Sequence, residues 1–131
     1  MSYARVTLAS TTALLLLSGA ALAQDAVDPN EAQLAFNNHC RTCHVTREGD
    51  HRLGPSLHGV IGREAGAASG YPYSPAMANA DFVWDAAAID RFIQNPEALV
   101  PGNNMKPFSG VASPEERAKI VAHLEAASDG Q

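Results

Sequence analysis

The segment Cys40-Arg41-Thr42-Cys43-His44 places two thiols and an imidazole within five residues. Cys40 and Cys43 are the only cysteines of the 131-residue chain. Cys-x-x-Cys-His is the spacing of an attachment site for c-type haem. Thiols one helical turn apart share a face, where both can add to the vinyl groups of one porphyrin, and the imidazole of His44 can then bind the iron. The motif predicts one covalently bound haem c.

Three other uses of the cysteines explain less of the motif. A thioredoxin-like redox pair would leave His44 without a role and would require a βαβ context, which the sequence lacks. A structural zinc site needs four ligands, usually from two such clusters, and the chain has one cluster. A disulfide between Cys40 and Cys43 would close a very short loop and stabilise little.

Residues 1–23 have the pattern of a cleaved secretory signal peptide. Arg5 is the only charged residue before Asp25, Leu14 to Leu17 form an apolar centre, and Ala21-Leu22-Ala23 matches a signal-peptidase site. The unbroken apolar run is shorter than the roughly 18–20 residues of a membrane span. We therefore predict export to the periplasm without stable membrane insertion. The alternative is an uncleaved anchor, because Ser10 to Thr12 delimit the apolar run only weakly.

Residues 24–131 are predicted to form one small domain. Removal of residues 1–23 takes away Arg5 and no acid, so eight basic and 14 acidic side chains remain and the net charge is −6. This balance argues against a nucleic-acid surface. A domain of this size buries only a marginal core by itself, and a large apolar porphyrin would supply much of its interior.

The periodicity of the domain predicts an all-α fold with a loop-rich middle. A helix capped by Asp28, with Pro29 first, runs into the haem motif. Glycine and proline are frequent from residue 45 to 81, which predicts loops with short turns. Further helices are predicted from Asp85 to Asn95 and from Ser113-Pro114, the latter with a capping box to Glu116.

The second axial ligand of the iron would decide the function, and two methionines of the mature chain could provide it. Met105 follows a Pro101-Gly102 turn and has polar neighbours, so it fits a ligand loop better than a core position. The alternatives are Met77, or no methionine, in which case Met105 only fills a gap in the core. A thioether ligand gives a closed site of raised potential that suits electron transfer.

Several further motifs follow at characteristic distances: Gly54-Pro55-x-Leu57-His58-Gly59, Gly62-Arg63, Gly70-Tyr71-x-Tyr73, Trp84, Asn95-Pro96 and Pro101-Gly102-x-x-Met105. Together with the haem motif, they make residues 28–127 resemble class I cytochrome c, in its mitochondrial-like and bacterial cytochrome c2 branch. The resemblance implies the small cytochrome c fold, in which the N- and C-terminal helices cross. It also implies that Phe36 and the apolar face of the last helix form this crossing.

The resemblance further implies a set of site residues. Cys40 and Cys43 would hold the haem, and His44 and Met105 would bind its iron. The Pro55 carbonyl would accept the ring N–H of His44, and a haem propionate would contact Arg63, Tyr73 and Trp84.

The sequence also departs from the family in three places. Phe92 replaces a frequent tyrosine near the methionine ligand, and Lys106-Pro107-Phe108 is one residue longer than usual. Lysines around the haem edge are few, with His39, Glu97 and Asn104 at matching positions. We interpret His39, His51, His58 and His123 as structural or surface residues.

These features predict a soluble, monomeric periplasmic carrier of single electrons that is not an enzyme. Its partners would be redox proteins, such as a cytochrome bc1-type complex, a terminal oxidase or a periplasmic dehydrogenase. One rival is a peroxidase or gas binder with an open iron position. Another is a fixed subunit of a periplasmic dehydrogenase or oxidase.

Overall fold

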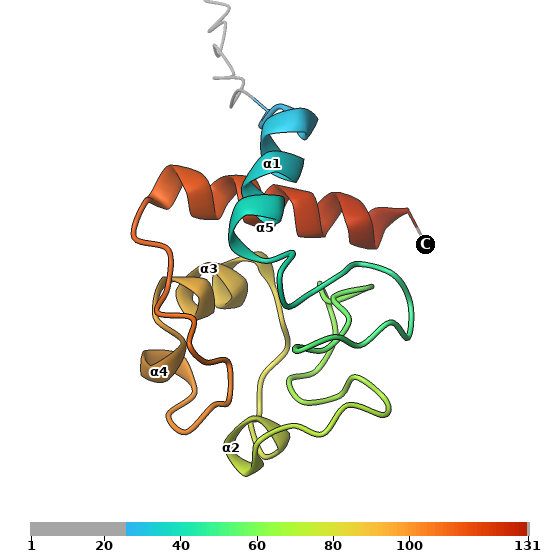
Figure 1. Ribbon diagram of the computed structural model, residues 1–131, viewed down its shortest axis with the longest axis vertical. Coiled ribbons are helices and arrows are strands. Elements are labelled where there is room, and N and C mark those ends of the chain that lie inside the picture. The colour runs from blue at the N-terminus through green and yellow to red at the C-terminus, as the bar shows by residue number, and fades with distance from the viewer. Residues whose placement is uncertain (1–25, 131) are drawn as a thin grey trace, which may run out of the picture.

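The computed structural model describes residues 26–130, so the predicted signal peptide of residues 1–23 lies outside the described part of the chain. Three longer helices and two single-turn helices, joined by long loops, make up this part (Figure 1). They are α1 (Pro29–His39), α2 (Pro75–Ala78), α3 (Ala86–Gln94), α4 (Pro96–Leu99) and α5 (Pro114–Asp129). Within residues 26–130 the only β-type pairing is an isolated bridge between Glu64 and Val83. The prediction of an all-α fold is confirmed.

Helix α1 begins where its capping residues predict. A carboxylate oxygen of Asp28 accepts the Asn30 N–H at 2.7 Å, and Pro29 occupies the first helical position, where no N–H is needed. The buried face of the helix consists of Ala32, Ala35 and Phe36. The helix ends at His39, so the first cysteine of the haem motif follows it directly.

Helix α3 corresponds to the helix predicted over residues 85–95. Asp85 caps it through Ala88 N–H at 2.6 Å, and Asn95 is the residue after its end. Its buried residues include Ile89, Phe92 and Ile93, as the apolar spacing predicts. The sequence analysis did not predict α4. Asn95 also accepts the Ala98 N–H at 3.2 Å, so this residue both ends α3 and caps α4.

Helix α5 begins with half of the predicted capping box. Ser113 Oγ accepts the Glu116 N–H at 3.2 Å. The Glu116 carboxylate turns away from the cap and lies 3.2 Å from Lys119 and 3.5 Å from His39 of α1. The second half of the box is therefore replaced by a contact between the terminal helices.

The terminal helices α1 and α5 cross and pack against each other (Figure 1). The ring of Phe36 lies 4.5 Å from the ring of His123, and Ile120 of α5 is completely buried. Lys119 Nζ lies 3.3 Å from the Glu31 carboxylate at the edge of the contact. The predicted crossing of these helices is confirmed, and it fixes the direction in which the chain enters the haem motif.

A buried arginine joins α5 to α3, and the sequence analysis did not anticipate it. Arg117 is 6% exposed, and its Nε donates to Asp90 of α3 at 2.7 Å. Its Nη1 donates to the carbonyls of Val111 and Ala112 at 3.0 and 2.8 Å. A guanidinium out of water needs such partners, because an unpaired buried charge is strongly destabilising.

The middle of the chain is largely loop, as predicted, except for the single turn of α2. His51 joins two parts of this region: its Nδ1 accepts the Ser56 N–H at 3.1 Å, and its Nε2 donates to Ser69 O at 2.8 Å. The bridge of Glu64 with Val83 brings residues 62–65 beside residues 82–84. Within residues 26–130 no helix combines the length and apolar character of a membrane-crossing segment.

The crossing of α1 and α5 predicts a pH dependence of stability. Burial against Phe36 lowers the pKa of His123 below its ordinary value, because the charged imidazolium loses water there. The unfolded chain then binds a proton more readily than the folded protein. The stabilisation is present above about pH 6.5 and is lost as the pH falls through the lower folded-state pKa.

We expect His123→Phe to reduce this loss of stability, since phenylalanine keeps a ring beside Phe36 and does not titrate. The measurement is urea unfolding of both proteins between about pH 7.5 and pH 5. An equally steep fall in the free energy of unfolding for the variant would contradict the assignment to His123.

Candidate haem site

The haem motif lies on a turn that directly continues α1. Cys43 N–H and His44 N–H both donate to the Cys40 carbonyl, at 3.0 and 2.9 Å. The motif is therefore not inside the helix proper, but its last bond has the helical i to i−4 spacing. The turn leaves Cys43 close enough to Cys40 to affect its pKa, as the sequence spacing leads us to expect. No disulfide joins Cys40 to Cys43.

The surroundings of the thiols do not suit a redox dithiol. Burial, and next the neighbouring Cys43, raise the pKa of Cys40 to about 12, so this thiol is uncharged at neutral pH. Reactive cysteines of the thioredoxin type have lowered pKa values instead. Within residues 26–130, no three His, Cys, Asp or Glu side chains gather closely enough to hold a metal ion by themselves. The motif is better suited to attaching a porphyrin.

The His44 ring is held in one orientation. The ring is buried, and its Nδ1 lies 2.8 Å from the carbonyl oxygen of Pro55, the residue that the resemblance names. A carbonyl can only accept, so Nδ1 carries the proton and Nε2 has a free lone pair. Burial lowers the pKa of His44, although the bond to Pro55 opposes this effect. The imidazole is therefore neutral and available as a ligand.

Gly54 gives the ring its space. A Cβ built on Gly54 would lie 2.6 Å from His44 Nδ1, a distance that no real side chain could keep. The backbone of residue 54 therefore lies directly against the imidazole. Gly54-Pro55 acts as a unit in which the first residue leaves room for the ring and the second orients it.

Arg63 carries an unpaired donor that fits an anionic group. Its two terminal nitrogens donate to His58 O at 2.9 Å and to Ser56 O at 3.0 Å. Among the buried side-chain nitrogens and oxygens of residues 26–130, only Arg63 Nε has no hydrogen-bond partner. A buried N–H of a cation without an acceptor is costly. A haem propionate is an acceptor of the right charge for this N–H.

Tyr73 and Trp84 both lie near Arg63, Tyr73 by its electrostatic influence and Trp84 by a backbone hydrogen bond. Burial lowers the pKa of Arg63, and the electrostatic influence of the nearby Tyr73 partly offsets this shift. Trp84 N–H donates to Arg63 O at 2.9 Å in the pairing of residues 62–65 with residues 82–84. The structure therefore gathers the three residues for which the resemblance implies a propionate contact.

Trp84 also forms part of an aromatic cluster. Its ring lies 4.7 Å from Phe82 and 5.1 Å from Phe92, both edge to face. Phe92 is buried and has no hydroxyl that could approach a methionine sulfur. The position where the family often has a tyrosine thus contributes only packing in this chain.

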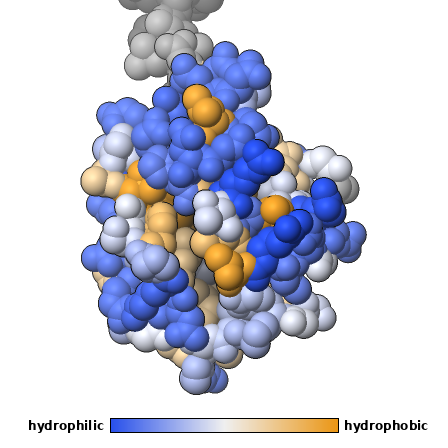
Figure 2. Space-filling view, viewed as in Figure 1, coloured by the Kyte–Doolittle hydropathy of each residue, from blue (hydrophilic) through white to orange (hydrophobic). Residues whose placement is uncertain are grey.

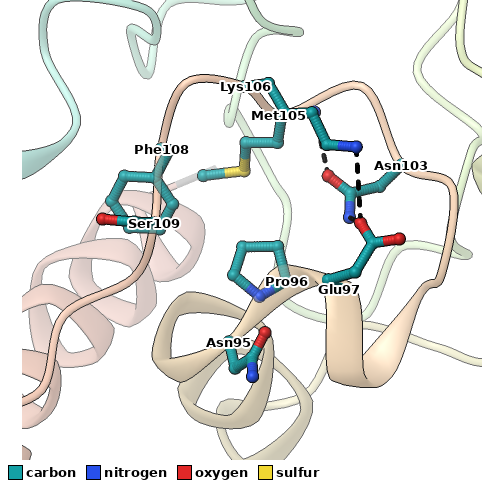
Figure 3. A pocket seen from close by; sticks show the side chains of 8 residues that line it. All are labelled: Asn95, Pro96, Glu97, Asn103, Met105, Lys106, Phe108 and Ser109. Atoms are coloured by element: carbon teal, nitrogen blue, oxygen red, sulfur yellow. Dashed lines mark hydrogen bonds and ion pairs between the residues drawn. The ribbon is translucent and has the colours of Figure 1, made fainter.

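The two candidate methionines occupy different environments. Met77 belongs to α2 and is a buried member of the hydrophobic core. Met105 lies on the loop after α4 and is partly buried against the same core. It lines a pocket of about 210 Å³, in which its side chain extends toward Phe108 above Pro96 (Figure 3). Met105 is therefore the methionine that faces an accessible space.

The face of the molecule seen in Figure 2 is hollowed between α4 with its following loop and the loops of the middle segment, and apolar residues gather in the hollow. Cys40 and Trp84 belong to the hydrophobic core, and Tyr73 and Met105 pack against it. Residues from four separate segments thus surround one apolar region. The arrangement fits a large, flat, mostly apolar cofactor with a charged edge.

The sequence analysis missed some contributors to the site. Ser56 and His58 bind Arg63 through backbone carbonyls, which leave no signal in the side-chain pattern. The sequence analysis treated the neighbours of Met105 only as polar, yet the Asn103 side chain is buried and its Oδ1 accepts the Met105 N–H at 2.9 Å. An asparagine that bonds the backbone two residues later is a known turn signature, so the Gly102-Asn103 sequence could have revealed it.

Comparison with known proteins identifies the family. The family model described as cytochrome C oxidase, cbb3-type, subunit III matches residues 27–124. Cytochrome c2 of Rhodopila globiformis is 39% identical over 98 residues, which cover 75% of this chain and 92% of that protein. Cytochrome c2 of Rhodomicrobium vannielii is 37% identical over 120 residues, which cover 91% of this chain and 93% of that protein.

A solved structure agrees as well. Cytochrome cH from Methylobacterium extorquens superposes with a TM-score of 0.68 at 33% identity, covering 76% of this chain and 98% of that structure. Fold, sequence and the Cys-x-x-Cys-His motif thus point to the same family. The chain belongs to the cytochrome c family, and its cofactor is covalently bound haem c with its iron.

Proposed function

We propose that this protein is a periplasmic one-electron carrier whose haem c has His44 and Met105 as axial ligands. The observation that carries the proposal is the oriented, neutral imidazole of His44 immediately after the two thiols. The haem, when bound, supplies a one-electron Fe(III)/Fe(II) couple. The roles of the chain are to attach this group, to fix its ligands and to limit its contact with water.

Cys40 and Cys43 would form the attachment. Each thiol would hold the haem through one thioether bond to a vinyl group, with the thiol hydrogen passing to the other vinyl carbon. No oxidant or reductant is needed for this addition. The predicted signal peptide of residues 1–23 supports the proposed compartment, because bacteria attach haem c outside the cytoplasm.

Arg63, Tyr73 and Trp84 would hold an inward-facing propionate. The unpaired Nε of Arg63 supports this role, as does the Tyr73 hydroxyl, which accepts the Ala68 N–H at 3.3 Å and keeps its own proton for another acceptor. Burial raises the pKa of Tyr73, so its hydroxyl remains a donor at neutral pH. A paired carboxylate can then remain charged out of water.

A second candidate function is a fixed subunit of a larger oxidase, because the description of the matching family model names an oxidase subunit. The relatives called cytochrome c2 favour the independent carrier, since the alignments cover 92% and 93% of their lengths. Size-exclusion chromatography of untreated periplasm separates the two. Elution as one small protein supports the carrier, whereas elution in a large complex supports the subunit.

Covalent attachment is the first property to test. We expect the haem to remain on the polypeptide after extraction with acid acetone, because two thioether bonds hold it. Cys40→Ala combined with Cys43→Ala should yield little folded protein, since the small apo domain buries too little apolar surface. Loss of the porphyrin from an intact wild-type chain would contradict the proposal.

The two methionines give a matched pair of variants. Met105→Ala should abolish the near-infrared sulfur-to-iron band, lower the reduction potential and admit carbon monoxide. Met77→Ala should keep the band but lose about 2–5 kcal/mol of stability, because it leaves a cavity in the core. Absorption spectra and urea unfolding check both variants, and the opposite pattern would assign the ligand to Met77. If the wild-type protein itself binds carbon monoxide readily, the better interpretation of its function is a peroxidase or gas binder with an open iron position.

The charge distribution predicts how the carrier meets its partners. The chain without residues 1–23 has a net charge of −6, and Lys106 beside Met105 lies 3.6 Å from the Glu97 carboxylate. The ligand loop therefore offers no strong positive patch, while Pro107 is exposed and Phe108 partly so. We expect docking on a neutral or basic patch, with a largely apolar contact.

Rising ionic strength should then leave electron transfer nearly unchanged, or slow transfer to a basic partner as charges become screened. Stopped-flow kinetics from low to high salt, with the native acceptor beside an oxidase that has an acidic docking site, tests this expectation. Fast transfer to the acidic oxidase at low salt, declining steeply as salt is added, would reveal a basic patch and overturn it.

A further inference from the structure

A small polar cluster joins α4 to the loop that carries Met105 (Figure 3). One carboxylate oxygen of Glu97 accepts the Gly102 N–H at 2.8 Å. The other accepts from Asn103 Nδ2 at 3.2 Å. Glu97 thus binds the loop at two consecutive residues, and hydrogen bonds to a charged acceptor are stronger than neutral ones.

Asn103 passes this restraint on to the methionine. It is 2% exposed, and Nδ2 also donates to Val100 O at 3.0 Å. Its Oδ1 accepts the Met105 N–H at 2.9 Å. Both ends of the amide are therefore used, so the side chain cannot rotate without breaking bonds in a buried place.

We propose that Glu97 and Asn103 are positioning residues that keep Met105 in its ligating conformation. This inference rests on the proposed function, in which Met105 is an axial ligand. The restraint acts on the Met105 amide, next to the carbon that bears the thioether chain. A neutral thioether is not held to the iron by opposite charge. The fraction of time for which Met105 stays bound therefore depends on how rigidly its loop is held.

The nearby ion pair of Lys106 with Glu97 does not account for how the Met105 loop is held. Lys106 Nζ lies 3.6 Å from Glu97, and the two side chains are 64% and 54% exposed. A pair this exposed contributes little to stability. Lys106→Gln therefore removes the charge pair and leaves the hydrogen bonds of Glu97 to Gly102 and Asn103 in place.

The experiment displaces the methionine with added imidazole and follows the sulfur-to-iron band of the oxidised holoprotein. Glu97→Gln is nearly the same size but turns one acceptor into a donor, so that the side chain can no longer accept from both Gly102 N–H and Asn103 Nδ2. Asn103→Ala removes the acceptor of the Met105 N–H. We expect each variant to bind imidazole about tenfold more tightly, which matches the loss of about one to two hydrogen bonds.

Two control variants separate this effect from charge. Lys106→Gln removes the ion pair, and Glu125→Gln makes the same charge change as Glu97→Gln at an exposed site on α5. Both should remain within about twofold of wild type. An equal effect of Lys106→Gln and Glu97→Gln would show that surface charge is responsible and would overturn the inference.

Hydrogen exchange gives a readout that a general loss of structure would not imitate. We expect faster exchange at the amides of Gly102 and Met105 in Glu97→Gln, and unchanged exchange in α1 and α5. The double variant should be less than additive, since both residues act through one network. Faster exchange throughout the protein would mean a purely structural role and would overturn the inference. If Asn103→Ala does not fold, Glu97→Gln decides the matter alone.

Failure of this inference can be distinguished from failure of the proposed function. If Met105→Ala loses the band while Glu97→Gln and Asn103→Ala bind imidazole like wild type, Met105 is the ligand and the cluster does not position it. If Met105→Ala keeps the band, the proposed ligation itself is wrong.

Discussion

The packing of α1 against α5 is the constraint on which the haem site depends. Cys40 follows α1 directly, so any rotation or shift of that helix would move both thiols and His44 together. Phe36 against His123 and the buried Ile120 hold the crossing from inside, and Lys119 with Glu31 borders it. In a domain with so small a core, this one contact gives the attachment motif a fixed starting point.

The loops of the middle segment supply hydrogen-bond acceptors to the polar side chains that lie close to the apolar site. Pro55 turns its carbonyl toward His44, and Ser56 and His58 turn theirs toward Arg63. These acceptors are backbone groups in loops, where carbonyls are not already used in a helix. The loop-rich composition is therefore what allows the site to satisfy its imidazole and guanidinium groups.

The two sides of the site are held in different ways. His44 follows a packed helix and rests on Gly54, so its position is set by the core. Met105 comes from a loop with exposed neighbours, and that loop is held by hydrogen bonds of Glu97 to Gly102 and Asn103 and of Asn103 to the Met105 N–H. Regions held by few buried apolar contacts open more easily than cores. In the carrier that we propose, the Met105 side would accordingly be the part of the site where ligation is modulated without unfolding the protein.

Local sequence signals determined the helix boundaries, because each depends on nearby residues: Asp28 before Pro29, Asp85 before α3, and Ser113 before Pro114. The cofactor was predictable for the same reason, since Cys40, Cys43 and His44 stand within one turn. The resemblance to the cytochrome c family also predicted roles at the site for Pro55, Arg63, Tyr73 and Trp84. Asn95 showed the limit of such local signals, because it ends α3 and caps a further helix that periodicity could not reveal in so few residues.

Only the tertiary structure decided which groups face each other across long distances in sequence. Arg117 contacts Asp90, Glu116 turns to His39 rather than completing its capping box, and Met77 enters the core while Met105 lines a pocket. The unpaired Nε of Arg63 and the hydrogen bond of Asn103 to Glu97 also depend on how separate segments pack. Sequence pattern specifies which residues a helix buries, but the partner of a polar side chain depends on how separate segments pack, since hydrogen bonds are short and directional.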